Sequence, residues 1–121
     1  MPRKTLPTQP YPLAGIVMSL PGGREVRISP WTFIRIMELI ACAKAMIPGA
    51  KAIADEEMHE LALTELHLRR QLQVSLDEGG YTLKFRKPKR ARPRDAAWLD
   101  LVRERVEAIN EGRPRAYRYP A

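Results

Sequence analysis

The hydrophobic period of this chain changes from about four residues to two at Gln71, and this change restricts the fold more than any other feature. Residues 72–76 (LQVSL) and 81–85 (YTLKF) each alternate apolar and polar side chains, and DEGG at 77–80 joins them. Two alternating runs around a glycine-containing turn predict a β-hairpin. We expect one face of this hairpin to be apolar and the other to carry Gln, Ser, Thr, Lys and Arg.

Three helices and another hairpin, which comes first in the chain, are predicted in the rest of the sequence. The runs LAGIVMSL (13–20) and EVRIS (25–29) flank Pro21-Gly22-Gly23 and predict the first hairpin. Three helices are expected at 30–46, 55–70 and 95–111, and a break near Ala62-Leu63 in the second one stays open. The fold class is therefore predicted as α+β, in the order hairpin, helix, helix, hairpin, helix.

The ends of the predicted helices carry ordinary signals. Ser29 precedes Pro30 as an N-cap followed by proline at the first helical position, and Gly112 stops the last helix. In the first helix Thr32, Arg35 and Glu38 fall on one narrow polar strip, and nearly every other side chain is apolar. A helix this apolar is expected to be central to the core or shared with a partner.

The chain of 121 residues is interpreted as one domain, 13–111, between two arms. Residues 1–12 are rich in proline, and residues 112–121 read GRPRAYRYPA. Both arms are expected to be extended and to become ordered only on a partner.

The positive charge of the chain is concentrated in one segment, KFRKPKRARPR at 84–94. The chain holds 21 basic and 14 acidic residues, and without this segment the numbers are 14 and 14. Such a localised charge favours a polyanion as the binding partner. The two prolines of the segment favour an extended backbone. Two alternatives remain for the segment. It could be a linker or a localisation signal, or its partner could be a protein or membrane surface. The seven basic residues are Lys84, Arg86, Lys87, Lys89, Arg90, Arg92 and Arg94.

No catalytic or metal-binding constellation is apparent in the sequence. His59-Glu60 begins a zinc-protease pattern, but Leu63 stands where the second histidine must be, so His59 is expected to face solvent. His67 would lie about 12 Å from His59 along a helix, too far to share a metal. The lone Cys42 excludes an internal disulfide. We expect a cytoplasmic protein that is not an enzyme and has no cofactor, no metal and no membrane segment.

Three short motifs together resemble a known family. They are Ile28-Ser29-Pro30, Leu68-Arg69-Arg70-Gln71-Leu72 and Gly80-Tyr81-Thr82-Leu83. In this order they resemble the winged helix-turn-helix effector domain of response regulators such as OmpR and PhoB, over about Arg24 to Phe85. The resemblance implies a small winged-helix-like domain that contacts DNA through its third helix and its wing. The residues so implied are Thr64, His67, Arg69, Arg70 and the segment 84–94.

The chain departs from that family in three respects. It offers a single visible helix where the family has two before the wing, Glu65 stands where the family buries an apolar residue, and the strand run before the first helix is shorter than usual. Several of the implied residues also have a purely structural explanation. Arg69 and Arg70 suit the end of a helix, where Arg69 can pair with Glu65, and Lys84 and Arg86 on an edge strand discourage further pairing.

Two functions of different class remain. The first is a small basic nucleic-acid-binding protein, a DNA-binding regulator or accessory factor, with RNA as a variant. The second is a non-enzymatic subunit or phage-encoded inhibitor that binds a larger protein or nucleoprotein assembly through its arms. The partner-binding residues would then be Arg115, Tyr117, Arg118 and Tyr119. The single apolar stripe of the last helix permits packing on the core or on a second copy.

Overall fold

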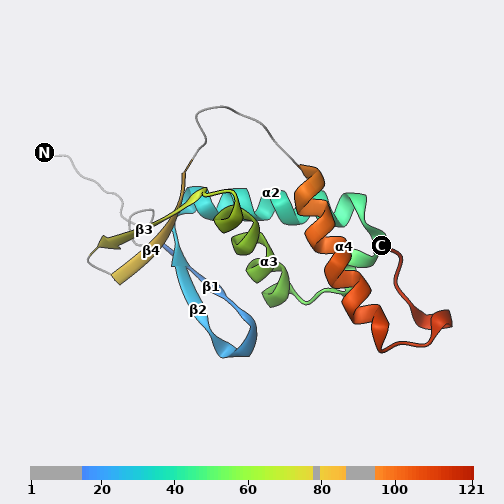
Figure 1. Ribbon diagram of the computed structural model, residues 1–121. Helices are drawn as coiled ribbons and strands as arrows, with labels where there is room; N and C mark the ends of the chain where they lie inside the picture. The colour runs from blue at the N-terminus through green and yellow to red at the C-terminus, as the bar shows by residue number, and fades with distance from the viewer. Residues whose placement is uncertain (1–14, 78–79, 87–94) are drawn as a thin grey trace, which may run out of the picture.

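The computed structural model describes residues 15–77, 80–86 and 95–121 (Figure 1). The predicted N-terminal arm and residues 87–94 of the basic segment lie outside these ranges. Three α-helices and a four-stranded sheet are described, which confirms the α+β class. Their bounds are β1 (Ile16–Ser19), β2 (Glu25–Ile28), α2 (Pro30–Met46), α3 (Asp55–Leu68), β3 (Leu72–Asp77), β4 (Gly80–Phe85) and α4 (Asp95–Glu111).

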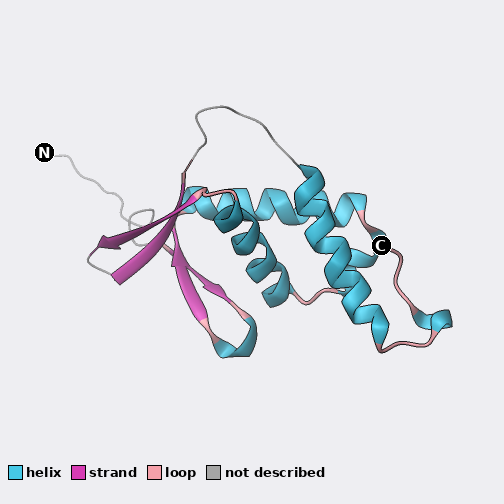
Figure 2. Cartoon of the chain, in the orientation of Figure 1, coloured by secondary structure: helices cyan, strands magenta, loops and turns pink. Residues whose placement is uncertain are grey.

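The two hairpins form one sheet with the strand order β1-β2-β4-β3. Strands β1 and β2 are antiparallel, as are β3 and β4, while a parallel bridge between Ile28 and Leu83 joins β2 to β4. The hairpins diverge from this junction, and the β3–β4 hairpin extends away from the helices (Figure 2). The far part of that hairpin therefore lacks the helical cover that its base has.

A buried threonine connects α2 to the second hairpin. Thr32 is fully buried; its hydroxyl accepts a hydrogen bond from Phe85 N–H at 2.6 Å and donates one to the Leu83 carbonyl at 3.1 Å. The Ser29 side chain caps α2 as predicted and also bonds the Thr32 hydroxyl at 2.7 Å. Thr32 is thus not part of a solvent-facing polar strip. Its hydroxyl instead bonds backbone groups of β4, as a neighbouring strand would.

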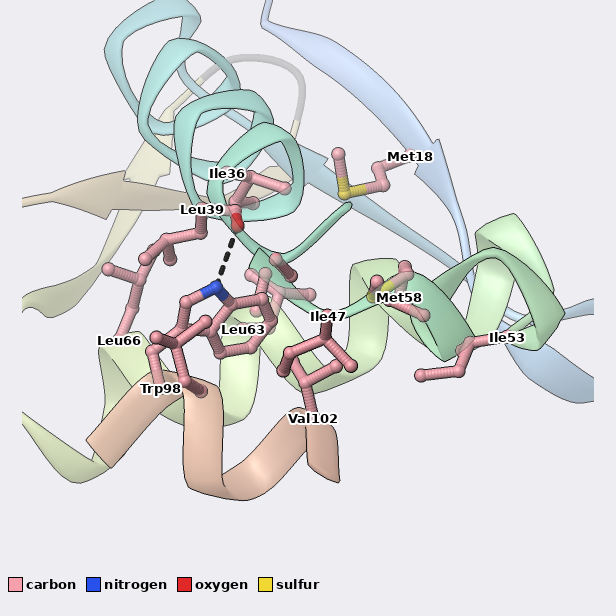
Figure 3. Close-up of a cluster of buried hydrophobic side chains, with 14 of the residues drawn as sticks. Met18, Ile36, Leu39, Ile47, Ile53, Met58, Leu63, Leu66, Trp98 and Val102 are labelled. Carbon is pink, nitrogen blue, oxygen red and sulfur yellow. Dashed lines mark hydrogen bonds between the residues drawn. The ribbon is translucent and has the colours of Figure 1, made fainter. Parts of the chain in front are cut away.

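The core lies between the helices and the inner face of the sheet (Figure 3). Trp98 is fully buried at the start of α4, and its indole N–H donates to the Leu39 carbonyl of α2 at 2.6 Å. Val102 and Val106 continue the buried stripe, which answers the open question for α4: this stripe packs on the protein's own core. The second predicted helix is one continuous helix, α3, without a break at Ala62-Leu63.

The C-terminal tail is not an extended arm, which corrects the prediction. Tyr119 exchanges two hydrogen bonds with the Asn110 side chain, at 2.7 and 2.8 Å, and its ring lies 4.4 Å from the Arg113 guanidinium. Its side chain packs, partly buried, against the core. The amide of Asn110 satisfies the backbone of Tyr119 as a neighbouring strand would, so the tail folds back onto its own domain.

Candidate nucleic-acid interface

The base of the second hairpin adjoins the end of α3. The backbone N–H of Arg86 donates to the Gln71 carbonyl at 2.6 Å, and Lys84 lies opposite Gln73 in the β3–β4 register. Arg70 immediately precedes Gln71, and the side chains of Arg70, Lys84 and Arg86 are all exposed. We call these three residues the basic ribbon surface. It lies where the chain enters 87–94, the part of the basic segment outside the described residues.

Lys84 and Arg86 lie on the outer face of the sheet. Residues two apart on a strand share a face, so they lie with Thr82 and opposite to the inward-facing Leu83. The Arg27 guanidinium of β2 extends across this face and donates to the Thr82 hydroxyl at 2.7 and 3.1 Å. Sequence reasoning missed Arg27. The alternation in EVRIS places it away from the core, but only the non-local β2–β4 bridge brings it beside β4.

The predicted hairpin alternation is confirmed, but burial does not follow it. Thr82 on the polar face is only 3% exposed, whereas the apolar side chains Val74, Leu76 and Tyr81 are 61%, 69% and 70% exposed. The apolar side chains are exposed because the far part of the ribbon extends beyond the helices (Figure 1). Thr82 lies nearer the junction with β2, where the Arg27 side chain contacts it.

The exposed face of α3 has opposite charge at its two ends. Thr64 and His67, which the sequence suggests as nucleic-acid contacts, are exposed near its C-terminal end. On the same helical stripe, Glu56 is exposed in the first turn and Glu60 pairs with Arg24 at 2.5 Å. Carboxylates on this stripe repel phosphates, so only the last turn of α3 is electrostatically suited to approach nucleic acid.

Arg69 and Arg70 have different surroundings although they are adjacent. Arg69 bonds the buried carboxylate of Glu65 at 2.8 Å, which confirms the predicted pairing. Together they line a hollow of about 270 Å³ between the end of α3 and the start of α4, whose other lining residues include Asp100 and Glu104. The Arg69 side chain is therefore paired with Glu65 on the α3–α4 side of the molecule, where Asp100 and Glu104 also line the hollow.

Arg70 ends α3 in the left-handed conformation, with φ = 57°. Its N–H donates to the His67 carbonyl, and that of Gln71 donates to the Leu66 carbonyl, which is the bonding of a Schellman motif. This position is usually glycine, since a side chain there costs about 1–2 kcal/mol. The side chain of Arg70 is exposed, so its burial does not offset this strain.

Several cations elsewhere on the described surface pair with acids, while Lys51, Arg115 and Arg118 are exposed and take part in none of the ion pairs between described residues. Six ion pairs occur among the described residues: Arg24–Glu60, Arg35–Glu38, Lys44–Asp55, Arg69–Glu65, Arg103–Asp100 and Arg105–Glu57. No acidic side chain in the described ranges pairs with Arg70, Lys84 or Arg86. The basic ribbon surface thus retains its positive potential.

The predicted partner-binding residues of the tail separate into two groups. Arg115, Tyr117 and Arg118 are exposed, whereas Tyr119 packs against the domain. The Arg118 guanidinium donates to the Arg113 carbonyl at 3.2 Å, so part of its hydrogen-bonding capacity is used locally.

The other candidate sites of the sequence were a metal site at the histidines and a membrane segment. Over 15–77, 80–86 and 95–121, no group of three or more His, Cys, Asp or Glu side chains could hold a metal ion. His59 does not simply face solvent, since its Nδ1 is 2.8 Å from the Ser19 carbonyl. None of the described helices is long and apolar enough to cross a membrane.

In comparisons with known proteins, no protein-family model, no curated protein and no solved structure matches this chain.

Proposed function

We propose that this protein binds nucleic acid, with duplex DNA as the main ligand, through the basic ribbon surface and the basic segment 84–94. One observation carries the proposal: the exposed cations Arg70, Lys84 and Arg86 gather at the base of the second hairpin, and no acidic side chain of the described residues pairs with them. Lys84 and Arg86 are the first two of the seven basic residues in segment 84–94. Positive potential concentrated in this way attracts a phosphate backbone.

The binding mode that this geometry favours is winged-helix-like, with the β3–β4 hairpin as the wing. The wing and the basic segment neutralise phosphates, which gives affinity and register but no sequence code. Thr64 and His67 in the last turns of α3 are the side chains best placed to reach base edges. The carboxylates of Glu56 and Glu60 keep the first turns of α3 away from the backbone, so we expect weak sequence preference.

The second candidate, a subunit of a larger assembly, is favoured by the apolar residues exposed on the hairpin, Val74, Leu76 and Tyr81. The C-terminal tail supports it less than the sequence suggested, because the tail folds back onto Asn110. The exposed ring of Tyr81 also offers a base-stacking platform, so single-stranded RNA belongs in the test.

The test is fluorescence anisotropy of labelled duplex DNA and single-stranded RNA of equal length, titrated with the full chain at several salt concentrations. One variant combines Arg70→Ala, Lys84→Ala and Arg86→Ala. Its control combines Lys51→Ala, Arg115→Ala and Arg118→Ala, which removes three exposed cations elsewhere and so gives the same net charge.

We expect the ribbon variant to bind duplex DNA more weakly and to reduce the salt slope by about 2.7, which corresponds to three lost phosphate contacts. The control variant should keep the slope of the wild type. Equal losses in the two variants would show that net charge alone drives binding. RNA bound more tightly than DNA, with the same ribbon dependence, would favour the single-stranded variant.

A further inference from the structure

The outer edge of β3 has no partner strand in the described part of the chain. Strand β3 lies at one end of the order β1-β2-β4-β3 and is six residues long. It contains no proline and no lysine, the residues that commonly protect an open edge. Two of its apolar side chains, Val74 and Leu76, are 61% and 69% exposed.

The hydrogen bonding to β4 shows which backbone groups of β3 face outward. The bond from Arg86 N–H to the Gln71 carbonyl marks these two residues as a hydrogen-bonded pair. In an antiparallel ladder such pairs recur every two residues, so Gln73 and Ser75 direct their N–H and C=O groups toward β4. Leu72, Val74 and Leu76 must direct theirs toward the open edge.

We propose that a second copy of this chain pairs with β3 in antiparallel fashion, about a twofold axis that passes midway between the Val74 residues of the two copies. Val74 then lies opposite Val74 of the second copy, and Leu72 lies opposite Leu76 of the second copy. Every residue with outward-facing backbone groups meets another such residue, so each pair exchanges both of its hydrogen bonds. The result is one continuous eight-stranded sheet.

Side-chain chemistry agrees with this register and excludes a shift by one residue. Leu72, Val74 and Leu76 lie on one face of β3, and in this register they oppose each other across the interface with Tyr81 beside them. A shift by one residue would put the apolar face of one copy against the polar face of the other.

The contact uses the same strand on both copies and therefore closes into a dimer.

This arrangement has a consequence that rests on the proposed function. A twofold axis perpendicular to the sheet keeps the outer faces of both copies on the same side. The two basic ribbon surfaces would then face one nucleic acid together, as two half-sites do.

Sedimentation equilibrium of the full chain without nucleic acid tests the dimer separately from nucleic-acid binding. Val74→Lys and Val74→Glu each place like charges directly across the twofold axis, so each variant alone should be monomeric. An equimolar mixture of the two should form a heterodimer, which also shows that both variants fold.

The wild type is expected to sediment as a dimer in a concentration-dependent manner. A wild type that stays monomeric at all concentrations would overturn the proposal, because another segment or partner would then cover this edge. A dimeric Val74→Lys variant, or a mixture that associates no better than its components, would also overturn it.

Discussion

Replacing Arg70 with glycine is expected to stabilise the fold and to weaken nucleic-acid binding. Arg70 holds a left-handed conformation with φ = 57° at the end of α3, and its side chain is exposed. The two hydrogen bonds of the Schellman motif involve only backbone atoms, so glycine keeps them. The substitution therefore removes backbone strain and one cation, and it leaves every packing contact of the core in place.

The expected size of the stability change follows from two opposing effects. Glycine relieves about 1–2 kcal/mol of strain in the left-handed region. It loses about 0.5–1 kcal/mol because the unfolded chain becomes more flexible. The net gain is about 0.5–1 kcal/mol in the free energy of unfolding, or about 2–5 °C in Tm for a chain of this size. Loss of one phosphate contact lowers the salt slope of DNA binding by about 0.9.

Two control variants separate the backbone effect from the charge effect. Arg70→Lys keeps the charge and the strain, so both properties should match the wild type. Arg70→Ala keeps the strain and loses the charge, so the slope should fall while Tm stays. The measurements are urea and thermal unfolding by circular dichroism, with anisotropy for binding. A Tm for Arg70→Gly at or below the wild-type value would refute the strain argument, and unchanged DNA binding by both Gly and Ala variants would refute the assignment of Arg70 to the interface.

Three further substitutions test how the ribbon and the tail are held. Thr32→Val keeps the shape but leaves a β4 N–H without its partner, and urea unfolding should show a loss of about 1–3 kcal/mol that Thr32→Ser largely avoids. Trp98→Phe removes the indole bond to the Leu39 carbonyl and leaves a small void, so unfolding should again show a loss of about 1–3 kcal/mol. Gly49→Ala places a methyl group into the carbonyl of Pro120, so trypsin should cleave the C-terminal tail faster than in the wild type. An unchanged cleavage rate would mean that the tail does not pack there.

Local signals in the sequence predicted the elements well. The Ser29-Pro30 pair marked the start of α2, and Gly112 marked the end of α4. The alternation from Gln71 onward gave the faces of β3 and β4 correctly. These features depend on residues within a few positions of each other, so the sequence contains the information needed.

Features that depend on distant contacts were not predictable in the same way. The sequence places Thr32 on a polar strip because its partners, Leu83 and Phe85, lie some fifty residues further along the chain. The sequence places Tyr119 in an extended arm because no residue near it in the chain indicates the pairing with Asn110. The bridge between β2 and β4, which places Arg27 on the candidate interface, is likewise non-local.

The salt dependence of DNA binding by the full wild-type chain tests the central claim most directly. If all seven cations of segment 84–94 engage phosphates, a plot of log affinity against log salt concentration should have a slope of about −6. A flat plot, or no detectable binding of duplex DNA at low salt, would contradict the account.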